Sequence, residues 1–188
     1  MDAAGIDRAV VLSAAYGFSN PFKNPGPDEY VRVRAENDWV SQQVARYPRR
    51  LTDFCAVNPL RDYALREIER CSKDPNLRSG LKLHFGNCDV NLDIEEHVER
   101  TRAVFAAANV HGMSIVVHAR PNIDHHRPYG AKQARVFLER LLPAALDISA
   151  FWRHGRHWVA SLYRTGNLSP QRRTWAKCIP WLPWIPSE

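Results

Sequence analysis

The sequence lacks several features that identify common classes of protein. No apolar run approaches the roughly 20 residues that a membrane-spanning helix needs. The first residues have neither the basic start nor the small-residue cleavage site of a secretory signal. The four cysteines are widely spaced and form no CxxC pair, so we expect buried or incidental thiols rather than a zinc knuckle or a disulfide framework. These absences predict a cytoplasmic protein that does not bind membranes.

Both glycine-rich signatures of nucleotide binding are also missing. No GxGxxG follows the first predicted strand, and no GxxxxGK(S/T) occurs anywhere in the chain. This absence counts against a doubly wound nucleotide-binding sheet, although the pattern of apolar segments alone does not separate such a sheet from a barrel.

The net charge of +6 is concentrated at the carboxyl end. Residues 151–188 hold six basic side chains and one acidic side chain, whereas the preceding 150 residues hold 20 and 19. The same end contains five of the six tryptophans and has no helical or strand period. The charge therefore does not predict a nucleic-acid partner for the whole chain, and the composition predicts a boundary near residue 150.

Short apolar segments alternate with longer amphipathic segments between residues 8 and 144, which is typical of parallel strands joined by crossover helices. The predicted strands are residues 8–13, 51–57, 79–84 and 113–118. The predicted helices are residues 36–47, 63–72, a segment that begins after Asp93, and residues 130–144. Residues 14–35 contain three prolines and are predicted to form a long loop.

The helix after Asp93 is the clearest of the four. Asp93 and Glu96 have the spacing of a capping box, in which each side chain accepts from an exposed backbone amide. The residues predicted to form its buried stripe are Ile94, Val98, Thr101, Phe105 and Ala108.

In a parallel barrel the reactive side chains lie at the carboxyl ends of the strands. The candidates at these positions are Ser13, Asn58, Lys82, His84, His118 and Arg120. Lys82 and His84 alternate with leucines, so they share one face of a strand. We assign catalytic roles to both: the lysine binds a carboxylate or polarises a carbonyl, and the histidine transfers protons or binds metal. The alternative is that both remain solvated at the rim.

His118 ends the apolar run SIVVH, from which a neutral imidazole could bind a divalent metal. Its alternative role is that of a hydrogen-bonded, partly buried histidine. Asn58 and Arg120 are candidates for substrate binding, Arg120 through an anionic group. His125 and His126 are interpreted as part of a polar loop rather than a metal site.

The stretches GIDRAVVLS, NDWVSQQVARYPRRLTDFCAVNPL, GLKLHF and GMSIVVHARP carry a family resemblance. In order and spacing they resemble the amidohydrolase-related group of metal-dependent hydrolases and decarboxylases, within the amidohydrolase superfamily. The resemblance implies a (β/α)₈ TIM-type barrel with one divalent metal, usually zinc, acting on a small carboxylated or lactone substrate. His118 matches the metal-ligand histidine of the family's fifth strand. The expected partner is therefore a small molecule, with a homo-oligomer as the further expectation.

The chain also departs from the family pattern. The HxH pair of the first strand, a later histidine near the metal and the aspartate of the eighth strand have no counterpart here. Because Met1 lies at what resembles the helix before strand two, we expect an α/β partial barrel of about strands 2 to 5 or 6. The metal of complete relatives is not expected to be retained, and the fragment is expected to be inactive.

The tail has an unusual relation to the genetic code. Tryptophan has a single codon, so the frame one nucleotide later is partly determined for AFWRHGRHW, residues 150–158. That frame can spell HFGGTGGIG, which resembles the family's sixth-strand histidine and glycine-rich turn. We interpret residues 1–148 as the partial barrel domain and residues 149–188 as an irregular, disordered, out-of-frame tail. The alternative is a non-catalytic remnant or interaction module with a genuine basic, tryptophan-rich tail.

Overall fold

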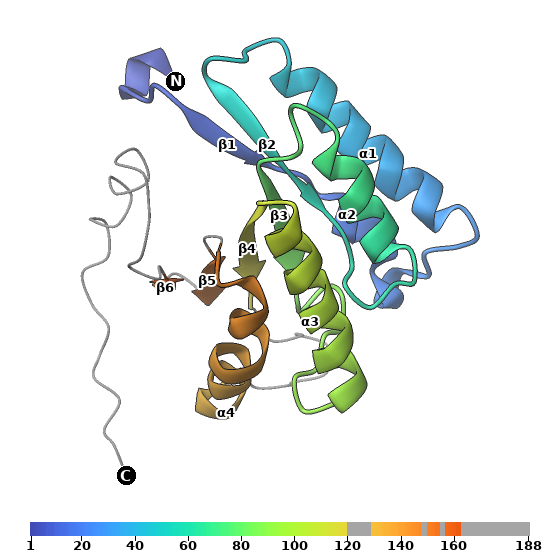
Figure 1. The fold of residues 1–188 in the computed structure, drawn as a ribbon. Coiled ribbons are helices and arrows are strands. Elements are labelled where there is room, and N and C mark those ends of the chain that lie inside the picture. Colours follow the sequence, from blue (N-terminus) through green and yellow to red (C-terminus); the bar gives the residue numbers. More distant parts are fainter. Residues whose placement is uncertain (120–128, 148–149, 155–156, 163–188) are drawn as a thin grey trace.

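The computed structural model describes residues 1–119, 129–147, 150–154 and 157–162, the last two ranges as backbone (Figure 1). Their strands form a single sheet in the order β1-β2-β3-β4-β5-β6. The bounds are β1 (Ala9–Leu12), β2 (Leu51–Ala56), β3 (Gly80–His84), β4 (Ser114–His118), β5 (Ala150–His154) and β6 (His157–Leu162). Arg120, His125 and His126 lie outside the described residues.

Strand order and direction decide between the two architectures that the sequence leaves open. The strands β1 to β5 are parallel to one another, each paired with the next along the chain, and β6 pairs antiparallel with β5. A doubly wound sheet reverses its order at a switch point, whereas a barrel adds strands in one direction. The structure is therefore a partial TIM-like barrel, and the four predicted strands are confirmed.

The helices lie between the strands and cover one face of the sheet (Figure 1). They are α1 (Glu29–Val44), α2 (Ala64–Ser72), α3 (Glu95–Val110) and α4 (Ala131–Val136), the last continuing into a π-turn, Phe137–Leu141. The core between sheet and helices contains leucines of β3, such as Leu81 and Leu83, and helical residues such as Ile68 and Phe105, all fully buried. Parallel strands joined by helices bury one side of each strand in this way.

The prediction of a loop over residues 14–35 is wrong at its carboxyl end. The helix α1 begins at Glu29, directly after the last of the prolines and an aspartate, and it buries Val33 completely. The rest of that segment forms two short 3₁₀ turns, η2 (Ala15–Ser19) and η3 (Pro21–Lys23). The spacing of apolar residues did not predict the start of α1, because the apolar Val31 lies at an exposed position of its first turn.

The predicted capping box of α3 is also wrong. Neither cap hydrogen bond forms: Asp93 instead makes an ion pair with Lys132 and accepts a hydrogen bond from Gln133. Ile94, at the amino-terminal end of the predicted stripe, is 41% exposed, whereas the remaining predicted stripe residues are buried. Long-range contact with the segment around α4 therefore replaces the local cap.

The other face of the sheet is open at β1. Val10 and Leu12 are 49% and 41% exposed, and register places them on the same side of the sheet as Phe54 of β2. β1 is an edge strand of the described sheet, so no further strand covers this part of the barrel interior. The strands β5 and β6 fall within the segment predicted to be an irregular tail. The division at residue 148 stays a prediction, and residues 163–188 lie outside the described part.

Candidate functional site

The structure brings together two of the predicted site residues at the carboxyl ends of adjacent strands. His84 of β3 and His118 of β4 are register partners, and their ring centroids lie 4.4 Å apart at an interplanar angle of 44°. His84 is only 5% exposed. Because paired residues of parallel strands point to the same side of the sheet, both imidazoles face the barrel interior, as the family pattern implies.

Lys82 lies on the same face, two positions before His84. Its register partners are Ala56 of β2 and Val116 of β4, so it is in the middle of the sheet rather than at the rim. The side chain is 7% exposed. The alternative of a fully solvated lysine is thereby excluded, and an ammonium at this depth attracts an anionic or strongly polarised ligand group.

Tyr16 is the residue that the sequence reasoning missed. It lies in η2, the turn directly after β1, and its ring centroid is 5.0 Å from that of His84. Tyr16, His84 and His118 thus form a continuous row of rings. The available signal was the position of an aromatic residue three places after the predicted strand 8–13, at the edge of the sheet where loops carry function.

A backbone hydrogen bond engages one ring nitrogen of His84. The amide of Asn87 donates to Nδ1 of His84 at 3.1 Å. In the neutral imidazole, Nδ1 is then the acceptor and Nε2 carries the proton. The Nε2–H of the neutral ring is then a hydrogen-bond donor, a group suited to an oxygen acceptor rather than to direct metal coordination.

Asn58 is buried, and both ends of its amide contact backbone. Its Nδ2 donates to the carbonyl of Ser19 at 3.0 Å, and its Oδ1 accepts from the amide of Leu60 at 2.9 Å. These bonds tie the loop after β2 to the turn η2 that carries Tyr16. The structure thus gives Asn58 a positioning role, and its predicted contact with substrate stays a prediction.

Ser13 contributes to a buried polar network under the strand ends. Its hydroxyl donates to Oδ1 of Asn37 at 2.8 Å, and that amide also bonds to both the N–H and the C=O of Ala56. Asn37 further donates to Glu67 at 2.8 Å. Burial by itself would raise the pKa of Glu67, but hydrogen bonds from Arg70 and Asn37 outweigh it and hold this pKa below its ordinary value. The network fixes β1 and β2 against α1 and α2.

The described residues do not fit a complete metal centre. Among them, no group of three or more histidine, cysteine, aspartate or glutamate side chains is placed to hold a metal ion, whereas a catalytic zinc usually has about three protein ligands. His118 remains the candidate ligand, and Nδ1 of His84 is already engaged. The described cysteines are buried, as predicted, and burial raises the pKa of Cys88, so its thiol does not supply a thiolate.

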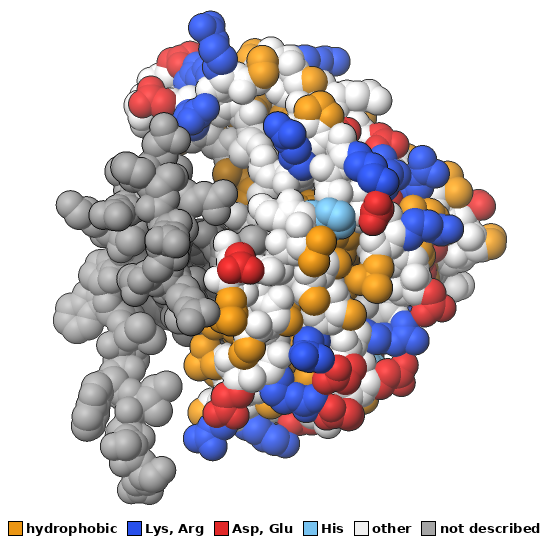
Figure 2. Space-filling model, in the orientation of Figure 1, with side chains coloured by type: hydrophobic (Ala, Val, Ile, Leu, Met, Phe, Trp, Pro, Cys, Tyr) orange, Lys and Arg blue, Asp and Glu red, His pale blue; other side chains and the backbone are white. Residues whose placement is uncertain are grey.

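No helix in the described part of the chain is long and apolar enough to cross a membrane. Basic side chains lie among acidic ones on the face shown in Figure 2.

Comparison with known proteins places this geometry in context. No family model matches the sequence, and no curated protein matches it. Among solved structures, the fold is similar to the crystal structure of the 5-carboxyvanillate decarboxylase LigW from Sphingomonas paucimobilis, with 26% sequence identity and a TM-score of 0.51. The match covers 78% of this chain and 43% of that protein, so the chain spans less than half of the decarboxylase's length.

Proposed function

We propose that the chain is part of an amidohydrolase-superfamily protein and that it carries the substrate-binding part of a metal-dependent hydrolase or decarboxylase. The substrate class is a small carboxylated or lactone compound. The similar solved structure is a decarboxylase of a carboxylated aromatic compound, which supports this class.

One observation carries the proposal: His84 and His118 lie at the carboxyl ends of neighbouring parallel strands, and Lys82 lies on the same face two residues before His84. The buried ammonium of Lys82 would bind the substrate carboxylate or polarise a lactone carbonyl. The Nε2–H of His84 would donate to a substrate oxygen and move a proton there. Tyr16 packs on His84 and limits its rotation.

His118 is the residue proposed to face the metal that the family implies. When bound, a divalent metal would polarise a carbonyl or activate water. The described residues supply one candidate ligand rather than a full set, so the roles of Lys82 and His84 are substrate binding and proton donation, which do not depend on the metal.

The incomplete ligand set favours a second candidate, a non-catalytic remnant of the same barrel that has kept its substrate-binding face. Metal content separates the two. Elemental analysis of the dialysed chain is expected to find well below one zinc per chain; stoichiometric zinc that His118→Ala abolishes would favour the enzyme over the remnant.

A measurement of substrate binding distinguishes both candidates from a chain that has lost the ability to bind substrate. We expect calorimetric titration with 5-carboxyvanillate or a carboxylated lactone to show binding that Lys82→Met weakens by about tenfold, or about 1.4 kcal/mol. The matched control is Lys73→Met, since Lys73 is exposed and forms an ion pair with Glu69, four residues before it. Equal affinities of the two variants would refute the role of Lys82.

A further inference from the structure

The turn η2 is held at its last residue by two side chains from the loop after β2. The backbone carbonyl of Ser19, a residue with no exposed surface, accepts from Nδ2 of Asn58 at 3.0 Å and from Nη2 of Arg61 at 3.4 Å. The hydroxyl of Ser19 in turn donates to the carbonyl of Tyr16 at 3.0 Å. Ser19 therefore connects Arg61 to the residue whose ring packs on His84.

Arg61 is itself fixed by an ion pair. Its Nε lies 3.0 Å from Oε1 of Glu29, the first residue of α1, and the same carboxylate accepts from the hydroxyl of Tyr63. The side chains of Arg61 and Glu29 are 32% and 13% exposed, so solvent screens this pair less than a fully exposed one. Arg61 thus joins three segments: the loop after β2, the start of α1 and the end of η2.

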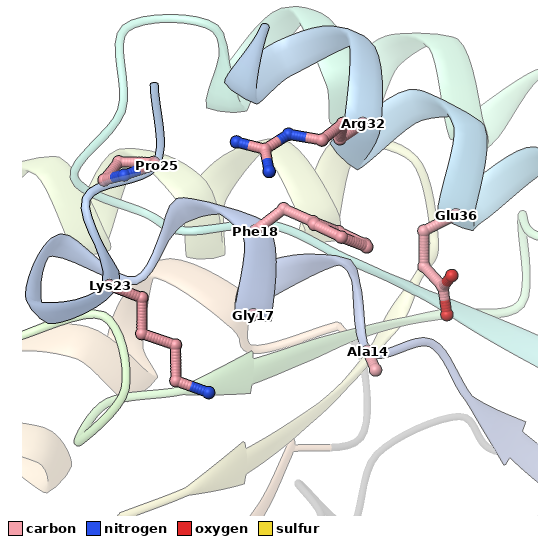
Figure 3. Close-up of a pocket in the computed structure, with 7 residues that line it drawn as sticks. All are labelled: Ala14, Gly17, Phe18, Lys23, Pro25, Arg32 and Glu36. Atoms are coloured by element: carbon pink, nitrogen blue, oxygen red, sulfur yellow. The ribbon is translucent and has the colours of Figure 1, made fainter. Parts of the chain in front are cut away.

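The middle of η2 has less packing to hold it. Gly17 and Phe18 line a cavity of about 450 Å³, with Lys23 and Arg32 among the other residues around it (Figure 3). Nothing lies within 4 Å of a Cβ built at Gly17. Groups that border a hollow lose van der Waals contacts on that side. The position of the turn therefore depends on the polar contacts at its end.

The charge of Arg61 also acts on the region around Lys82. Burial raises the pKa of the Cys88 thiol; a hydrogen bond with the backbone of His84 and the positive charges of Arg61 and Lys82 oppose this rise, while the carboxylate of Glu29 adds to it. The guanidinium of Arg61 and the ammonium of Lys82 are thus within electrostatic reach of one buried thiol. A test of Arg61 must for this reason separate its charge from its contact with η2.

We propose that Arg61 is a positioning residue for His84: by holding the carbonyl of Ser19 it keeps Tyr16 packed on His84 and so fixes the orientation of the His84 ring. The inference rests on the function proposed above, because it assigns Arg61 to the site which that function uses. The contact between the Tyr16 and His84 rings is measurable without any ligand.

The test is an NMR comparison of full-length variants. The ring centroids of Tyr16 and His84 lie 5.0 Å apart, so the ring protons should give a nuclear Overhauser cross-peak. Arg61→Met keeps the aliphatic stem but removes the donor, so this cross-peak should weaken and 5-carboxyvanillate should bind about fivefold less tightly. Arg61→Lys keeps a donor and a cation that can pair with Glu29, so it should retain most of both.

The matched control is Arg100→Met. Arg100 donates to a backbone carbonyl of the same loop, that of Leu60 at 3.0 Å, and pairs with Asp62 at 2.7 Å, but its contacts in the described part of the chain do not involve η2. It should leave the cross-peak unchanged and the affinity within about twofold. An unchanged cross-peak in Arg61→Met, or an equal loss in Arg100→Met, would overturn the inference.

Two further outcomes are decisive. A weakened cross-peak with unchanged ligand affinity would also overturn the inference, since Arg61 would then support the fold and not the site. If the wild-type chain binds no ligand, the proposed function fails, and the cross-peak alone decides whether Arg61 positions His84. Should Arg61→Met fail to fold, as judged by circular dichroism, the shorter and uncharged Arg61→Gln decides in its place.

Discussion

His84 of β3 and His118 of β4 are direct register partners, and their imidazole rings lie 4.4 Å apart, centroid to centroid. Neither residue is near the other in sequence. Their proximity results from the parallel pairing of β3 with β4 over five consecutive residues, from Gly80 with Ser114 to His84 with His118. The same pairing aligns Lys82 with Val116, so Lys82, His84 and His118 lie on one face of the two strands.

The first prediction concerns the proton on His84. Since Nδ1 accepts from the amide of Asn87 at 3.1 Å, the neutral ring should carry its proton on Nε2. Ring nitrogen chemical shifts measured by NMR distinguish the two tautomers. His97, whose Nδ1 accepts from the amide of Asn91 at 3.1 Å, should show the same tautomer and acts as an internal reference. A proton on Nδ1 of His84 would contradict the proposed donor role.

The second prediction is a pH dependence of stability that originates at Asp53. This residue is fully buried, and neither carboxylate oxygen accepts a hydrogen bond of normal geometry. Burial raises its pKa to about 7; the backbone amide of Phe54 opposes this rise, and the negative charges of Asp74 and Glu36 add to it. In the unfolded chain an aspartate releases its proton near pH 4, about its ordinary pKa.

Between those two pKa values the folded state binds more protons than the unfolded state, so the free energy of unfolding should fall as the pH rises from about 4 to 7. Asp53→Asn should remove this dependence and stabilise the protein above pH 7 by about 2–4 kcal/mol. Urea unfolding at pH 5 and pH 8 measures both effects. The control is Asp7→Asn at an exposed site, where no such change is expected. The same pH dependence in wild type and Asp53→Asn would show that another group is responsible.

A third prediction follows from the central place of Asn37. Its amide bonds to the hydroxyl of Ser13, to both backbone groups of Ala56 and to Glu67. Asn37→Ala leaves these buried groups without partners and should cost about 2–4 kcal/mol of unfolding free energy. Asn109→Ala, which removes a surface contact with Asp147, should cost less than about 1 kcal/mol. Comparable losses in urea unfolding would argue against a structural network at the strand ends.

The fourth prediction tests the packing inside the barrel. A Cβ added at Gly80 would meet the ring of Phe54 at 2.5 Å, so that ring lies directly over the glycine. Gly80→Ala should therefore destabilise the fold by about 1–3 kcal/mol. Gly17→Ala, where nothing lies within 4 Å of the added atom, should change stability little. Combining Gly80→Ala with Phe54→Leu should recover part of the loss, and additive losses would show that the contact is not the cause.

The predicted strands were recovered because their signal is local. Apolar and β-branched runs such as residues 51–57 and 113–118 require only neighbouring side chains to be recognised, and the structure places strands within both. The limits of the helices were less well predicted. Asp93 has the spacing of a cap, but its carboxylate is used by Lys132, a residue of a distant segment.

The sequence by itself determined that Lys82 and His84 share a face, since side chains of a strand alternate whatever surrounds it. It also determined the order of strands and helices, through the period of the apolar residues. Only the tertiary structure decided that His84 meets His118, that Tyr16 packs on His84, and that Lys23, Phe18 and Arg32 line one cavity. These relationships depend on the register between strands and on the path of the loop after β1, which are set by contacts between residues far apart in the chain.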